Sequence, residues 1–155
     1  MKNLLCVIHS PSKNTKDIEN AVLNNLKKEN LSLKIKSLSP FDANVSDVLD
    51  ADGLLIGTTE NLASMAGATK DFFDRTYNEL LYKKEGLPIA VWVRAGHDGT
   101  GTVNQMNSID ISSKSIYSTY SISFFCILQN VFTVVFDCFS KLILFINCLL
   151  YISGN

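Results

Sequence analysis

A short apolar segment that runs directly into a hydroxyl-rich turn constrains the fold of this chain most. Residues 4–8 (LLCVI) have strand length, and an amphipathic helical pattern begins at Asp17. In an α/β protein, a turn between a strand and a helix directs backbone N–H groups at one spot, where anions and above all phosphate bind. The candidate phosphate ligands in the turn are Ser10, Ser12, Lys13, Asn14 and Thr15.

This turn differs from the best-known phosphate loops. It lacks the glycines and the Lys-Ser/Thr pair of an ATP or GTP loop, and it lacks the spaced glycines of a dinucleotide fingerprint. Hydroxyl groups suit a single terminal phosphate, because one dianion accepts several O–H and N–H bonds. The alternative is a helix N-terminus capped by Asn14 or Thr15 without a ligand. Both interpretations stay open.

Strand and helix patterns alternate along the first two thirds of the chain. Such alternation with apolar strands predicts a parallel sheet with helices on both faces. Ligands bind beyond the carboxyl ends of the strands in these sheets. We therefore expect the loops at 10–15, 58–65 and 95–101 to meet at one edge. The patterns predict strands over residues 4–8, 31–36, 53–57 and 87–93, helices over 17–28 and 63–81, and a short helix or turn over 45–49.

Three segments resemble one known family. The turn at 10–15 (SPSKNT), the stretch 57–67 (GTTENLASMAG) with 70–75 (KDFFDR), and the glycine-rich loop 96–102 are similar to the flavin loops of flavodoxin-like FMN-binding proteins. The likeness is closest to NAD(P)H:quinone oxidoreductases and FMN reductases, and it covers about residues 3–108. It implies a three-layer α/β sandwich with parallel strand order 2-1-3-4-5. Lys13 stands where the family usually has glycine, and residues 61–62 lack the aromatic that many flavodoxins stack on the flavin.

The resemblance also implies a cofactor and an activity. FMN would be the cofactor, NAD(P)H the electron donor, and a quinone or similar small molecule the acceptor. His97 is a candidate for protonating a reduced quinone, although an exposed loop histidine is the alternative. A non-catalytic electron carrier and a truncated variant without flavin stay open. Besides the turn residues, the implied FMN-binding residues are Thr58, Thr59, Glu60, Asn61, Leu62, Ala63, Ser64, Met65, Gly96, Asp98, Gly99 and Thr100.

The composition changes near Gln105. Residues 106–155 contain no Ala, Pro, Glu, Arg, His or Trp, and the fifth strand and last helix of the family are not evident there. We expect an incomplete flavin-binding domain over 1–105, with that strand and helix missing or replaced, and an atypical tail over 106–155. Three interpretations of the tail stay open: a membrane anchor over 131–152, a non-native continuation, which we favour, and a diverged fifth strand and helix, with the strand at 124–128 or 132–136.

Charge and cysteine content limit the partners. The net charge of −1 and the pI of about 6.1 leave no basic surplus for nucleic acid. The four cysteines have no metal-binding spacing. Without an evident signal peptide we expect a cytoplasmic protein, with membrane contact through 122–152 only if the tail is an anchor. The oligomeric state stays open, with a homo-oligomer as one option.

Overall fold

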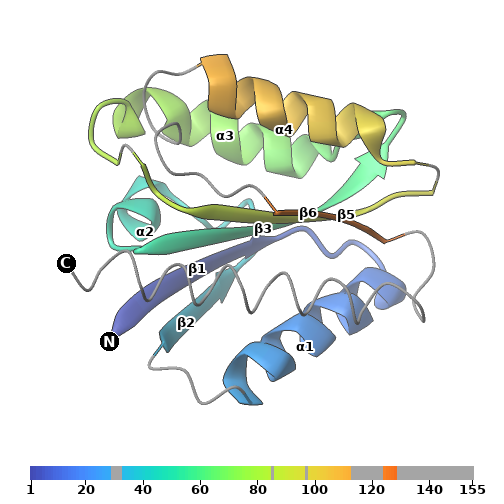
Figure 1. Cartoon of the computed structure of the whole chain (residues 1–155), viewed down its shortest axis with the longest axis horizontal. Coiled ribbons are helices and arrows are strands. Elements are labelled where there is room, and N and C mark those ends of the chain that lie inside the picture. Colours follow the sequence, from blue (N-terminus) through green and yellow to red (C-terminus); the bar gives the residue numbers. More distant parts are fainter. Residues whose placement is uncertain (29–32, 85, 97, 113–123, 129–155) are drawn as a thin grey trace.

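A central sheet with helices on both faces forms the molecule (Figure 1). The computed structural model describes residues 1–28, 33–84, 86–96, 98–112 and 124–128. The elements run in the order β1 (Lys2–Ile8), α1 (Lys13–Lys28), β2 (Leu33–Leu38), α2 (Val45–Leu49), β3 (Gly53–Asn61), β4 (Ser64–Met65), α3 (Gly67–Leu80), β5 (Ile89–Arg94), α4 (Thr100–Ser112) and β6 (Phe124–Leu128).

The main strands are parallel and lie in the order β2-β1-β3-β5-β6, with the short β4 paired to β3. This confirms the predicted order. The expectation that the fifth strand is missing is wrong, because β6 pairs with β5 from Ala90↔Phe124 to Arg94↔Leu128. The segment FFCIL is apolar at every position, as strands of parallel sheets usually are. Because the composition around this segment is unusual, only one of our three interpretations of the tail, the diverged fifth strand, included it.

Helix α4 runs from Thr100 through Gln105 to Ser112. The change in composition at Gln105 therefore lies inside a helix. Residues 113–123 and 129–155 lie outside the described residues, so the anchor expected over 131–152 and the division into a domain and a tail stay predictions. In the described part of the chain, no helix combines the length and the apolar character that crossing a membrane requires.

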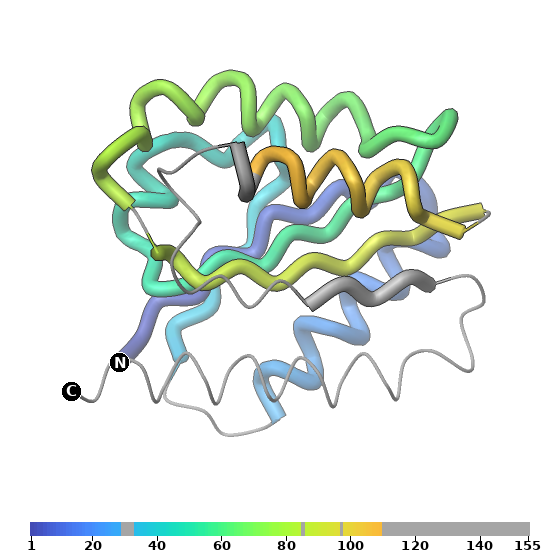
Figure 2. Tube along the Cα trace, turned by 45° about the horizontal axis from the view of Figure 1, so that its top comes forward, coloured from blue at the N-terminus to red at the C-terminus, as the bar shows by residue number. Residues whose placement is uncertain are grey.

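Alternate residues of β1 supply the cores on the two faces of the sheet. Leu5 and Val7 pack with the residues of α2, α3 and α4, whereas Leu4, Cys6 and Ile8 pack with Ile18, Val22 and Leu26 of α1. Figure 2 shows α1, in blue, on one side of the sheet and α3 and α4, in green and orange, on the other. Each buried aliphatic side chain of this size stabilises the fold by roughly 1.5–3 kcal/mol.

Two features of the α1 face are more specific. A Cβ atom on Gly57 of β3 would lie 2.4 Å from Cζ2 of Trp92, so glycine leaves the room that the indole occupies. Cys6 is a buried free thiol, as expected. Burial, followed by the charge of Glu19, raises the pKa of Cys6 to about 12. This thiol is therefore unreactive at neutral pH.

Candidate functional site

Three loops meet beyond the carboxyl ends of β1, β3 and β5. These strands are parallel neighbours, so the loops that follow them lie at the same edge of the sheet, on the right in Figure 1. The N–H of His9 donates to the carbonyl of Gly57 at 2.8 Å and ties the first loop to β3. Partial burial lowers the pKa of His9, which favours a neutral imidazole here. The meeting of the loops agrees with the expectation from strand order.

The first loop ends at Ser12, which caps α1. The Ser12 hydroxyl accepts from the N–H of Thr15 at 3.3 Å. The Thr15 hydroxyl donates to the Ser12 carbonyl at 2.9 Å and accepts from the Ser12 N–H at 3.0 Å. Thr15 is buried, and Ser10 donates to its carbonyl at 3.4 Å. The expected caps, Asn14 or Thr15, are therefore wrong, because the helix begins earlier, at Lys13.

The first turn of α1 retains unused donors. Among the described residues, the N–H groups of Lys13 and Asn14 have no hydrogen-bond partner, and the Asn14 side chain is exposed. The ammonium group of Lys13 binds Asp17 at 3.0 Å on a side chain that is 88% exposed, so it is already paired on the outside of the helix. The N-terminus of α1 can accept an anion through its backbone and its dipole.

The second loop is a β-hairpin, where we expected a helix from residue 63. Strand β3 continues past the sheet and pairs antiparallel with β4, Glu60 opposite Met65 and Asn61 opposite Ser64. The two-residue turn places Leu62 and Ala63 at φ 52° and 56°, the left-handed conformation that such turns require and that non-glycine residues adopt at a cost. Helix α3 therefore begins only at Gly67. Leu62 is fully exposed at the tip.

The third loop and the start of α4 pack directly against this hairpin. A Cβ atom on Gly101 would lie 2.0 Å from the carbonyl oxygen of Ala63, so only glycine allows the contact. Glu60 accepts from the N–H of Thr102 at 3.0 Å and caps α4 from the hairpin. Within the loop, Asp98 accepts from the N–H of Thr100 at 3.0 Å, and Gly99 has a φ of 74°.

Several predicted residues lie inside the protein and not on this surface. Thr58 is buried, with its hydroxyl 2.8 Å from that of Thr69, and Met65 is buried. The hydroxyl oxygens of Thr59 and Thr102 lack partners in the described part of the chain, but both are inaccessible from the surface. His97 lies outside the described residues. The predicted residues exposed at this edge are Ser12, Lys13, Asn14, Asn61, Leu62, Ala63, Gly96, Asp98 and Thr100.

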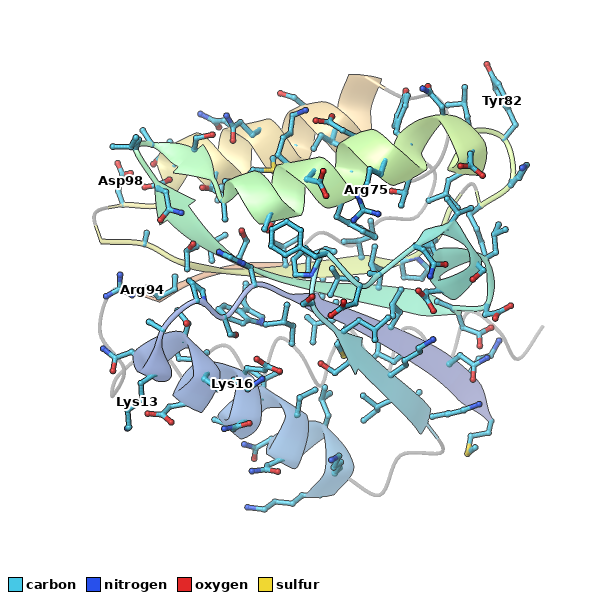
Figure 3. All side chains as sticks on the ribbon, turned by 180° about the vertical axis from the view of Figure 1, so that it is seen from behind. Lys13, Lys16, Arg75, Tyr82, Arg94 and Asp98 are labelled. Carbon is cyan, nitrogen blue, oxygen red and sulfur yellow. The ribbon has the colours of Figure 1, made fainter. Side chains whose placement is uncertain are left out.

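Two residues that the sequence did not indicate belong to this edge. Arg94 is exposed at the end of β5, opposite Thr59 in the register, and it has no carboxylate partner among the described residues. Figure 3 shows Lys13, Arg94 and Asp98 at the same end of the molecule. Gln105 of α4 binds the hairpin. A charge that ends an apolar strand was an available signal for Arg94, whereas nothing local marks Gln105.

Solved structures resemble this arrangement. Oxidised flavodoxin 1 from Bacillus cereus matches with a TM-score of 0.69 at 14% identity, over 94% of this chain and 97% of that one. An NADH:FMN oxidoreductase in its apo form matches with a TM-score of 0.71 at 20% identity, over 100% and 92%. A flavodoxin from the domain Archaea matches with a TM-score of 0.70 at 16% identity, over 95% and 98%. No protein-family profile matches the sequence, and no curated protein does. Identities this low establish the architecture alone, and the chain has the flavodoxin-like fold.

Proposed function

We propose that this chain binds FMN at the carboxyl edge of its sheet and transfers electrons from NAD(P)H to a quinone or similar small acceptor. The observation that carries the proposal is the N-terminus of α1. There, N–H groups without a partner among the described residues lie with hydroxyl side chains at the same edge as the hairpin and the glycine-rich loop. The likeness to an NADH:FMN oxidoreductase and to flavodoxins supports it.

The donors at α1 suit the phosphate of FMN. The N–H groups of Lys13 and Asn14 and the side chains of Ser10, Ser12 and Asn14 would hold it, with Thr15 fixing Ser12 from below. Arg94 is the candidate cation for the anionic ligand, because Lys13 already has a carboxylate partner. A helix N-terminus with several N–H and O–H donors binds a dianion without glycine spacing.

The hairpin and the third loop suit the flavin ring. Residues 61–63 are exposed at the hairpin tip, and so are Gly96, Asp98 and Thr100 of the third loop. Backbone groups along a flavin ring tune its potential, and bound FMN would supply the hydride and electron transfer itself. Glu60 holds α4, so it has a structural partner as well as its predicted place near the ring. His97 is the proposed proton donor to a reduced quinone.

Calorimetric titration with FMN, FAD and riboflavin tests the cofactor. We expect FMN to bind more tightly than FAD, and more tightly than riboflavin, which has no phosphate. If none of the three flavins binds, the proposal is wrong. If FMN and riboflavin bind equally tightly, the phosphate of FMN does not contribute to binding. Rapid anaerobic mixing of the FMN complex with NADH or NADPH then distinguishes a reductase from an electron carrier. The flavin absorbance of a reductase is lost directly on mixing, whereas that of an electron carrier is not.

A further inference from the structure

Helix α4 holds the β3–β4 hairpin through contacts that link distant parts of the chain. The carboxylate of Glu60 accepts from the N–H of Thr102 at 3.0 Å. The backbone of Gly101 packs on the carbonyl of Ala63. Gln105 Oε1 accepts from the N–H of Met65 at 2.8 Å and from the hydroxyl of Ser64 at 3.0 Å. The two segments therefore have a defined relative position.

Gly101 and Thr102 contact the hairpin through their backbone, whereas Gln105 contacts it through its side chain. Gln105 lies outside the predicted site. Its single oxygen satisfies two donors of β4, a strand of only two residues, Ser64–Met65. A pairing this short contributes little by itself. The turn that precedes it holds Leu62 and Ala63 in the left-handed conformation, which persists only where the surroundings enforce it. Loss of the Gln105 oxygen would remove the partner of the part-buried Met65 N–H and favour opening of the turn.

We propose that Gln105 is a positioning residue, which fixes the β3–β4 hairpin against α4 so that its tip presents one surface to the flavin ring. The inference rests on the proposed function, because it assigns the hairpin to the ring. Gln105 acts through Ser64 and Met65 and needs no contact with the ligand. Its effect should therefore be the same for any ligand that carries the ring, with or without a phosphate.

The test compares Gln105→Leu, which removes the acceptor, with Gln105→Glu, which keeps an acceptor oxygen in the same place. Asn104→Leu is the matched control, an exposed neighbour on the same helix. Amide hydrogen exchange at Met65 is measured in the flavin-free protein, and FMN and riboflavin affinities are measured by calorimetry. We expect Gln105→Leu to speed Met65 exchange and to weaken both flavins by about tenfold, which corresponds to the loss of one or two hydrogen bonds. Gln105→Glu should keep slow Met65 exchange and tight flavin binding, and Asn104→Leu should resemble the wild type.

The outcomes separate this inference from the proposed function. Unchanged Met65 exchange, or unchanged riboflavin binding, in Gln105→Leu overturns the positioning role. A loss of FMN binding with riboflavin binding intact also overturns it, since the effect would then lie at the phosphate. If the wild type binds neither flavin, the proposed function fails together with the role toward the ring, and Met65 exchange still decides whether Gln105 holds the hairpin.

Discussion

The polar groups at the two ends of the parallel sheet differ in how far they are paired. At the amino end, Asp52 accepts from the N–H of Asn3 at 2.8 Å and from the ammonium group of Lys2 at 3.0 Å. The Lys84 ammonium donates to the carbonyl of Ala51 at 2.6 Å. At the carboxyl end, Arg94 and the first N–H groups of α1 have no such partners within the described residues.

The difference distinguishes polar groups whose hydrogen bonds stabilise the fold from polar groups that can still bind a ligand. A charge paired within the protein adds modestly to stability and offers little to a ligand. An N–H at a helix N-terminus is satisfied by water until an anion replaces it. Substitutions at the amino end should therefore change stability alone, and substitutions at the carboxyl end should change ligand affinity as well.

The largest expected effect is that of Gly101→Ala. The added Cβ would meet the Ala63 carbonyl at 2.0 Å, so the hairpin or α4 must move, and overpacking of this kind costs about 1–3 kcal/mol. Thermal unfolding followed by circular dichroism should show the loss, and FMN affinity should fall with it. Gly67→Ala is the control, since a Cβ there meets nothing within 4 Å; it should be neutral or slightly stabilising. Equal stability of the two variants would contradict the packing argument.

A pair of helix caps gives the next comparison. Ser12 caps α1, and Asn44 caps α2 by accepting from the N–H groups of Ser46 and Asp47. Ser12→Ala and Asn44→Ala should each cost about 1 kcal/mol of stability. Only Ser12→Ala should also weaken FMN, by about 1–3 kcal/mol, because it removes a hydrogen bond to a charged group.

Riboflavin supplies the control for this pair, since it has no phosphate. Its affinity should be the same for the wild type and for both cap variants at a temperature where all are folded. If Asn44→Ala weakens FMN as much as Ser12→Ala does, the first loop has no special role.

A smaller effect distinguishes two cations at the carboxyl end. Arg94→Met should lower FMN affinity about threefold at low salt, with the difference disappearing at high salt, because exposed charges interact weakly and are screened. Lys13→Met should have less effect, since Lys13 is paired with Asp17 at 3.0 Å. Calorimetry at two salt concentrations measures both. A larger effect of Lys13→Met than of Arg94→Met would support Lys13 as the phosphate ligand that the sequence suggested.

The smallest effect is expected at the amino end, in Asp52→Asn. Burial alone would raise the pKa of Asp52, but the Asn3 N–H and the ammonium groups of Lys2 and Lys84 lower it below its usual value. A carboxyl whose pKa falls on folding stabilises the protein above its unfolded pKa, near 4, and loses that contribution as the pH falls. Denaturant unfolding should therefore show the wild type slightly more stable than Asp52→Asn at pH 7, with a smaller difference at pH 3. FMN affinity should not change.

The parallel sheet was predictable because its inner strands are apolar runs between polar turns. Residues 4–8 and 53–57 lie within β1 and β3, and the hydroxyl-rich turn does precede α1. Helix α4 was harder to predict, since its first turn holds threonine and glycine, which are weak helix formers. Strand β6 was concealed by the change in composition around it.

The geometry of the candidate site was only partly predictable. The usual sequence signal of a two-residue hairpin turn is Asn-Gly or Asp-Gly, but here Leu62 and Ala63 form the turn. The bond from Met65 to Gln105 joins residues 40 positions apart, and no local pattern indicates such a pair. Residue types therefore identified the loops, whereas the contacts between the loops depend on how β3 and α4 pack.

The space that Gly57 leaves for Trp92 gives the protein a built-in optical reporter. Trp92 is the single tryptophan of the chain, and it is buried against β3 on the face that α1 covers. Its fluorescence should be blue-shifted in the native state and move to longer wavelength when the sheet opens to water. Flavins absorb light in the range in which a buried indole emits, so a bound flavin would quench this emission. The fluorescence of one side chain should therefore report unfolding, and it would also report the proposed binding of a flavin, without a label.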